Sequence, residues 1–227
     1  MEISAPQYIF QTGSRICLTG PSMSGKTSLF CKIIKHRNQL FEAEINKLIM
    51  FCGIRNEKMI QHCDEIGVEF ENYQGLAQLE EVLTLKKDEL KNCIVLLDDL
   101  QAEIFINASV SKLMTIYAHH YKIGSVFITS QSLYGPGKQQ TTFNRNVSTY
   151  ILMRSYRLSA VALTLSRQLQ LEELPKIYSK YILGSQVSNY PYLVISLETP
   201  YAQLMFSTNI CSETEHRQIL VADSTQK

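Results

Sequence analysis

The sequence predicts an α/β fold in which a mostly parallel sheet is flanked by helices on both faces. Two observations carry this prediction. Short apolar runs of strand length alternate with segments whose apolar residues recur at helical spacing. The run at residues 93–97 (CIVLL) is continuously apolar, which is typical of a strand buried on both faces of a parallel sheet. With 227 residues, 45% of them hydrophobic, the chain suits one such domain.

In the first half of the chain, apolar runs mark four expected strands. They are residues 15–19, Lys47–Cys52, a short one at 68–70, and 93–97. A helix is expected from Ser24 to about Arg37, after the first strand. Another is expected over residues 76–90, where apolar side chains fall at 76, 79, 82, 83 and 90.

The second half continues the same alternation. Apolar residues at 110, 113, 114, 117 and 118 predict an amphipathic helix. Two more helices are expected over residues 160–169 and 172–182, where Pro175 fits the first turn of the second. Further strands are expected at Ser125–Ser130, Thr149–Met153, 192–197 and near 204–206. Residues 135–140 (GPGKQQ) read as a flexible loop, and we expect one domain over residues 1–211 with a polar, flexible tail at 212–227.

Composition argues against several other classes of protein. The six cysteines are scattered without a CxxC pair, so a zinc site is not expected, and four of them lie among apolar residues as in a protein of a reducing compartment. The first residues lack the basic and apolar regions of a signal peptide. No apolar stretch approaches the ~18 residues that a membrane span needs.

The segment after the first expected strand fits a phosphate-binding loop. Gly20-Pro21-Ser22-Met23-Ser24-Gly25-Lys26-Thr27 matches G-x-x-x-x-G-K-[ST] without a mismatch and lies between a strand and a helix, as the motif requires. Glycine lets the backbone curl so that N–H groups point at phosphate oxygens, and the helix adds its positive N-terminal end. We expect Lys26 to reach the β- and γ-phosphates of ATP and the Thr27 hydroxyl to bind Mg²⁺. A chance glycine turn is the alternative.

Two adjacent carboxylates, Asp98 and Asp99, follow the buried strand at 93–97. Open α/β sheets bind ligands at the carboxyl ends of their parallel strands. We expect Asp98 to hold the Mg²⁺ shell and Asp99 to polarise the attacking water, because a nearby cation helps to keep both carboxylates ionised. The alternative is that the pair only caps the next helix.

Gln131 follows Ser125–Ser130, a strand expected to end at the same edge of the sheet. An amide there can contact both the γ-phosphate and the attacking water, with Thr129 and Ser130 as candidate helpers. An ordinary polar strand end is the alternative.

The small net charge of +1 hides a local basic bias. Residues 104–171 contain no Asp or Glu but carry three lysines and four arginines, for a charge of +7: Lys112, Lys122, Lys138, Arg145, Arg154, Arg157 and Arg167. Such a window suits contact with nucleic acid phosphates. It can also supply an arginine finger, which raises the rate of phosphoryl transfer by about 10³–10⁵. For any single residue, a solvated surface charge is the alternative.

The order of motifs resembles the genome-packaging ATPases of the FtsK/HerA superfamily, in particular those of poxvirus-like viruses and of Maverick/Polinton and adintovirus-type elements. GPSMSGKT, CIVLLDDL, SVFITSQSLY, FNRNVSTYILMR and YPYLVISL follow one another, and the resemblance runs from about Gln7 to Ile210. The phosphate loop is common to many families. The combination of a DD pair, a strand ending in TSQ and an RN pair before another strand is more specific.

The resemblance implies a P-loop NTPase of the ASCE/RecA-like type with Mg·ATP as its ligand. Lys26 and Thr27 match the phosphate-loop roles, Asp98 and Asp99 match the metal and water-activating acids, and Gln131 matches the polar sensor. Many relatives have Asp-Glu at this place, so this chain departs from the more common pattern at Asp99.

The resemblance also implies assembly and partners. Arg145, which precedes Asn146, and Arg154, which ends the next strand, are the two candidates for an arginine that reaches a neighbouring subunit's ATP. The family forms rings, so a hexamer with double-stranded DNA in its channel is expected, packaging a genome into a shell of capsid proteins inside a host cell.

Two other classes share the phosphate loop. A small-molecule or nucleoside kinase needs an arginine-rich lid and an acceptor pocket, and no compact lid of this kind is evident in the sequence. A non-catalytic scaffold would bind ATP without hydrolysing it.

Overall fold

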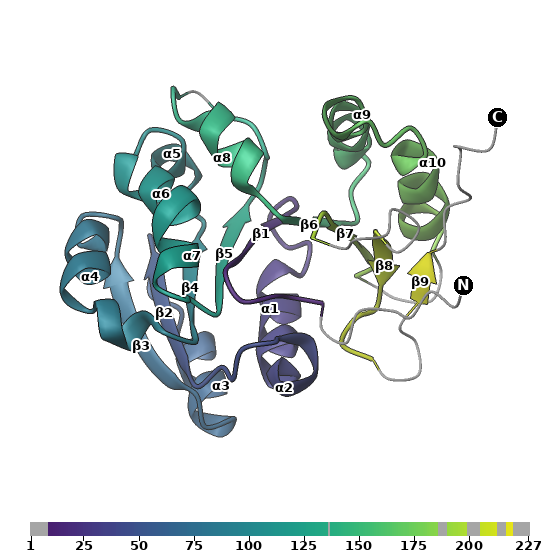
Figure 1. Cartoon of the computed structure of the whole chain (residues 1–227). Coiled ribbons are helices and arrows are strands. Elements are labelled where there is room, and N and C mark those ends of the chain that lie inside the picture. The colour runs from purple at the N-terminus through teal and green to yellow at the C-terminus, as the bar shows by residue number, and fades with distance from the viewer. Residues whose placement is uncertain (1–8, 136, 186–189, 199–204, 213–216, 220–227) are drawn as a thin grey trace, which may run out of the picture.

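The computed structural model describes residues 9–135, 137–185, 190–198, 205–212 and 217–219, which contain one nine-stranded sheet (Figure 1). Its strand order is β3-β2-β4-β5-β1-β6-β7-β8-β9. The strands from β3 to β6 in this order are parallel, and β7, β8 and β9 extend the sheet as antiparallel strands. The prediction of a mostly parallel sheet is confirmed.

The strands are β1 Ser14–Thr19, β2 Lys47–Cys52, β3 Glu69–Gln74, β4 Cys93–Asp98, β5 Ser125–Ser130, β6 Thr149–Met153, β7 Tyr192–Ser196, β8 Phe206–Thr208 and β9 Arg217–Ile219. The helices are α1 Lys26–Lys35, α2 Arg37–Leu40, α3 Glu57–Glu65, α4 Leu79–Leu85, α5 Gln101–Ile104, α6 Ala108–Lys112, α7 Ala118–His120, α8 Gln140–Asn146, α9 Leu158–Leu169 and α10 Leu174–Tyr178. A 3₁₀ turn, η1 Lys87–Leu90, and two π-helical turns, η2 Leu113–Tyr117 and η3 Ser179–Leu183, continue α4, α6 and α10.

Helices cover both faces of the sheet. In Figure 1, α1, α2 and α3 lie below it and α5 to α10 lie above it. Each layer of helices covers a separate apolar core. Phe30 of α1 and Phe127 of β5 belong to one cluster, and Leu113 of η2 and Ile128 of β5 belong to the other. Alternate side chains of a strand point to opposite faces, so a continuously apolar strand serves both cores.

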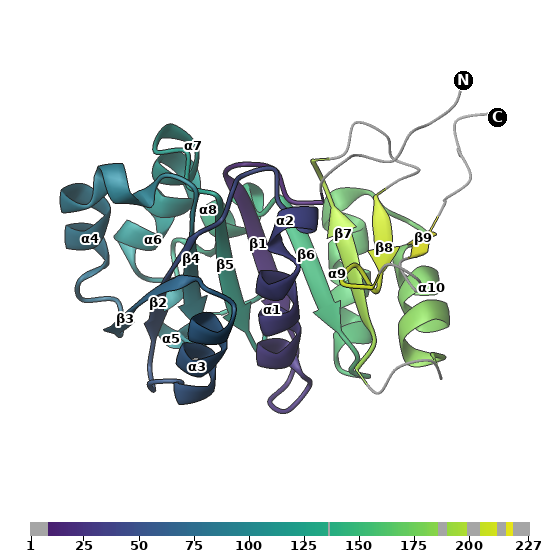
Figure 2. The ribbon, with the colours of Figure 1, turned by 90° about the horizontal axis from the view of Figure 1, so that it is seen from below.

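The parallel strands bring their carboxyl ends to one edge. Figure 2 shows β1, β5 and β6 running toward the edge where the loop between β1 and α1 lies. Strand β5 lies between β1 and β4, and its register pairs Thr19 with Ser130 and Asp98 with Thr129. The polar residues that end these three strands are therefore level with one another.

The bounds of β2, β5 and β6 are those predicted. The structure also contains elements that periodicity did not predict, among them α3 and α8. Helix α8 begins at Gln140, so it starts where the expected flexible loop ends, and Pro136 of that loop lies outside the described residues. Within the expected polar tail, Arg217–Ile219 pairs with β8 as strand β9, while residues 213–216 and 220–227 lie outside the described part. Among the described residues, no helix has the length and apolar character needed to cross a membrane.

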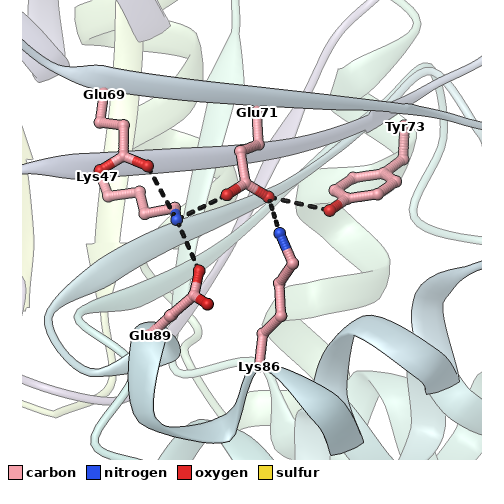
Figure 3. A network of polar contacts seen from close by, with 6 residues as sticks. All are labelled: Lys47, Glu69, Glu71, Tyr73, Lys86 and Glu89. Carbon is pink, nitrogen blue, oxygen red and sulfur yellow. Dashed lines mark hydrogen bonds and ion pairs between the residues drawn. The ribbon is translucent and has the colours of Figure 1, made fainter.

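A network of charges ties β2 to β3 and η1 (Figure 3). The buried ammonium of Lys47 contacts the carboxylates of Glu69, Glu71 and Glu89 at 2.9, 2.6 and 3.0 Å, respectively. Glu71 also accepts hydrogen bonds from Lys86 at 2.6 Å and from the Tyr73 hydroxyl at 2.8 Å. Partial burial acts to raise the pKa of Glu71, but the hydrogen bonds from Lys47, Lys86 and Tyr73 outweigh it and lower the pKa to about 2. Lys47 begins β2, so this network lies at the edge opposite the carboxyl ends of the strands.

Candidate functional site

The loop between β1 and α1 has the backbone that a phosphate-binding loop requires. Gly25 immediately precedes α1 and has a φ of 92°, a left-handed conformation that L side chains rarely adopt. Gly20 starts the loop where the chain packs closely, since a Cβ there would lie 2.6 Å from Cβ of Met153 and 2.6 Å from Oγ of Ser24. Both glycines of the motif are thus required by the geometry of the loop.

Two side chains of the loop, those of Lys26 and Ser24, carry hydrogen-bond donors that suit an anion. The half-buried Lys26 donates from Nζ to the carbonyl oxygens of Gly20 at 2.7 Å and Pro21 at 3.0 Å, so its ammonium lies over the loop. The buried hydroxyl of Ser24 has no hydrogen-bond partner among the described residues. The first N–H groups of α1 also lack acceptors within the helix. These donors fit the phosphate oxygens of a nucleotide.

Asp98 and Asp99 lie at the end of β4, and Thr129 of β5 holds both of them. The Thr129 hydroxyl donates to Oδ1 of Asp98 and accepts the backbone N–H of Asp99 at 3.2 Å. Asp99 has a φ of 53° and an exposed side chain, whereas Asp98 is partly buried. The two neighbouring carboxylates therefore differ in environment. Carboxylate oxygens are ligands that Mg²⁺ prefers, so the chemistry of this donor set fits the metal of a Mg·ATP complex.

The loop lysine and the acids lie within electrostatic reach of one another. Burial lowers the pKa of Lys26, and the charges of Asp99 and Asp98 act in the opposite direction. Burial raises the pKa of Asp98, whereas the hydrogen bond from Thr129 and the charge of Lys26 oppose that rise. The structure thus brings the phosphate loop and the acid pair to one site, although β5 separates their strands.

Gln131 follows β5 at the same edge and its side chain is exposed. Its backbone N–H donates to Oε1 of Gln101 at 3.2 Å, and Nε2 of Gln101 donates to the carbonyl of Tyr134 at 3.4 Å. Gln101 is the first residue of α5, two positions after Asp99, so its amide ties the loop that carries Gln131 to the segment that carries Asp99. The exposed side chain of Gln131 takes no part in these two hydrogen bonds.

The two candidate finger arginines lie at opposite edges. Arg154 follows β6 at the carboxyl edge, where its guanidinium donates to the carbonyls of Leu183 at 3.2 Å and Ser185 at 3.3 Å. Arg145 is exposed near the end of α8, just before β6 begins. Ser148, three residues later, donates its N–H to the carbonyl oxygen of Arg15 at the start of β1, so this segment lies at the amino-terminal edge of the strands. The structure therefore brings Arg154, but not Arg145, to the edge that carries the loop and the acids.

Thr129 was predicted only as a candidate helper, and its hydrogen bonds to Asp98 and Asp99 were not predicted. Two other residues of this edge, Gln101 and Tyr190, were not predicted as site residues. Gln101 has no motif to mark it, because its role depends on the approach of two loops. Tyr190 lies against Gly25 of the phosphate loop. The register of β4 with β5 is the signal that would have found the bridging role of Thr129, and register is not visible in one sequence.

No protein-family model matches this chain, and no curated protein matches its sequence. Solved structures do share its fold. The genome packaging NTPase B204 from Sulfolobus turreted icosahedral virus 2, in complex with sulfate, is similar with a TM-score of 0.56 at 11% identity, over 86% of this chain and 94% of that one. The same protein in complex with ATP-gammaS gives a TM-score of 0.51 at 12% identity, over 91% and 98%. The flagellar accessory protein FlaH from Methanocaldococcus jannaschii overlaps with a TM-score of 0.48 at 11% identity, over 93% and 90%. The chain has the α/β fold of the P-loop NTPases.

Proposed function

We propose that this chain is an ATPase that moves double-stranded DNA, and that it packages the genome of a virus or virus-like element into a capsid. The observation that carries the proposal is the convergence of Lys26, the Asp98–Asp99 pair and Gln131 at one edge of the sheet. A viral packaging NTPase shares the fold over nearly its whole length, which supports the finer assignment.

Each residue of the site has a distinct task in this proposal. Lys26 and the loop N–H groups bind the phosphates, while Thr27 and Asp98 hold Mg²⁺. Mg²⁺, when bound, neutralises charge on the β- and γ-phosphates. Asp99, exposed beside Asp98, orients a water and accepts its proton, and Gln131 contacts the same water and the γ-phosphate. An acid paired with a water-orienting amide suits hydrolysis better than transfer to a second substrate.

A basic face supports DNA as the partner. Six of the seven basic residues between positions 104 and 171 have exposed side chains: Lys112, Lys122, Lys138, Arg145, Arg157 and Arg167. They lie on or beside α6 to α9, which cover the same face of the sheet (Figure 1). Lys112 also pairs with Glu80 at 2.7 Å, so the other five are the stronger candidates for phosphate contacts.

Exposed apolar side chains at the nucleotide edge support a ring with ATP between subunits. Met23 of the phosphate loop is 96% exposed, Ile54 after β2 is 86% exposed and Tyr156 after β6 is 77% exposed. Burial of such side chains against a neighbour would stabilise an assembly. Arg154 lies at this edge and is the better placed of the two arginines to meet a neighbour's ATP.

The test is ATP hydrolysis with and without duplex DNA over a range of salt concentrations. We expect DNA to stimulate turnover, with less stimulation as salt rises, because counterion release drives phosphate contacts. Asp99→Asn should still bind ATP but lose turnover by roughly a hundredfold or more, as for loss of a general base. Turnover that ignores DNA at every salt concentration would refute the translocase, and unchanged turnover in Asp99→Asn would refute the assigned base.

A matched pair of variants tests the basic face. Lys138→Ala with Arg167→Ala should reduce DNA stimulation and leave DNA-free turnover unchanged. Lys35→Ala with Lys58→Ala removes two exposed charges from α1 and α3, on the other face of the sheet, and should leave stimulation unchanged. Equal losses in both pairs would show that net charge, rather than this face, governs DNA binding.

A further inference from the structure

A tyrosine ring lies directly against the phosphate loop. A Cβ on Gly25 would lie 3.0 Å from Cδ1 and 3.1 Å from Cγ of Tyr190. The side chain is nevertheless 56% exposed. A ring that lies against the loop and is more than half exposed can offer a flat apolar surface to a second flat group.

The sheet fixes the position of this tyrosine. Tyr190 comes just before β7, whose first residue, Tyr192, pairs with Met153 at the end of β6. The carbonyl of Pro191 accepts the N–H of Arg154 at 3.0 Å. Tyr190 is therefore held at the carboxyl edge, beside the loop.

The positions of the site residues indicate which way round a nucleotide would bind. The acids on β4 and Gln131 after β5 lie on one side of β1, while β6 and β7 lie on its other side. Residues that hold Mg²⁺ and the attacking water belong at the γ-phosphate end of the ligand. A triphosphate seated in the loop with its γ end toward β4 leaves its nucleoside toward β6 and β7, which is the side that carries Tyr190.

We propose that Tyr190 stacks on the base of the bound nucleoside triphosphate. This inference rests on the proposed nucleotide site and adds the residue that holds the base. Every base has a π-face, so stacking of this kind discriminates weakly between adenine and guanine. The protein should accept ATP and GTP with similar affinity, and both more tightly than a triphosphate that has no base.

The chain contains no tryptophan, so a single introduced indole would report on its own surroundings. In Tyr190→Trp, we expect Mg·ATP to reduce the indole emission and inorganic tripolyphosphate with Mg²⁺ to leave it unchanged. The matched control is Tyr156→Trp, at the other strongly exposed tyrosine of this edge. If ATP quenches the indole at position 156 and not the one at 190, the base lies elsewhere and the inference is wrong.

Affinities measured by calorimetry provide a second readout. Base stacking is worth enough that Tyr190→Ala should weaken Mg·ATP binding about tenfold or more, whereas Tyr190→Phe should retain it. Tripolyphosphate should bind Tyr190→Ala as it binds the unsubstituted chain. An equal loss for both ligands would mean that the ring only supports the loop. If the unsubstituted chain binds tripolyphosphate and ATP equally, this inference alone fails, and if it binds neither, the proposed function fails as well.

Discussion

Thr129→Val tests whether one hydroxyl holds the two acids in place. Valine is β-branched and has nearly the shape of threonine, and Thr129 is 1% exposed, so the substitution removes a buried hydroxyl without opening a cavity. Two interactions disappear: the hydrogen bond to the Asp98 carboxylate and the one from the Asp99 N–H. Asp98 then loses a contact that stabilises its charged form, so its pKa should rise further above the ordinary value.

The magnitude follows from the kind of bond that is lost. A hydrogen bond to a charged group contributes about 1.5–3 kcal/mol and a neutral one about 0.5–1.5 kcal/mol. Asp98 is only partly buried, so water can replace part of the hydrogen bond that its carboxylate loses. We therefore expect Thr129→Val to lower the free energy of unfolding by about 2 kcal/mol. The loss of both hydrogen bonds should also let the two acids move. A displacement that raises the activation free energy by about 1.4 kcal/mol slows ATP turnover tenfold, so we expect a loss of about tenfold or more.

The matched control is Thr129→Ser, which keeps the hydroxyl and loses one buried methyl group, at a cost of about 1 kcal/mol. Denaturant unfolding and steady-state ATP hydrolysis measure the two effects. Serine should turn over ATP nearly as fast as the unsubstituted chain. If the two variants lose turnover equally, the methyl packing matters and the bridging hydroxyl does not. A valine variant with unchanged stability would also contradict the reasoning.

Two further predictions concern the charge network and the trans arginine. Because the folded pKa of Glu71 is lowered to about 2 from 4.5, its stabilising effect is fully present above pH 4.5 and is lost as the pH falls toward 2. Glu71→Gln should reduce the change in the free energy of unfolding over that pH window by on the order of 2 kcal/mol. The control is Glu57→Gln, which removes an ion pair with Arg55 whose side chains are 65% (Arg55) and 66% (Glu57) exposed, and which should leave the pH dependence unchanged. Arg154→Ala should lose hydrolysis while still binding ATP, and mixing it with Lys26→Ala subunits, which retain Arg154 but cannot use their own ATP, should restore turnover. If mixing restores nothing, Arg154 does not act in a neighbour's site.

Much of the fold follows from local pattern. The apolar residues at the centres of β2, β5 and β6 led to the right bounds, because burial on both faces of the sheet restricts the choice of side chain. The ends of the helices were harder to predict. The expected helix at 76–90 divides into α4 and η1, and α8, rich in Gln, Thr and Asn, has no clear periodicity and forms against its neighbours. Tertiary packing decides such segments, since local propensity is weak.

The phosphate loop could be predicted from the residues alone, because its chemistry is local: two glycines, a lysine and a threonine stand at fixed spacing before a helix. The sequence also placed the acids and Gln131 at strand ends. Which of these residues lie close together depends on how the strands are arranged in three dimensions. Only the order of β4, β5 and β1 brings Asp98 within reach of Thr129 and Lys26, and only the direction of β6 separates Arg154 from Arg145. Strand order and register depend on contacts between distant segments, and one sequence carries no direct record of those contacts.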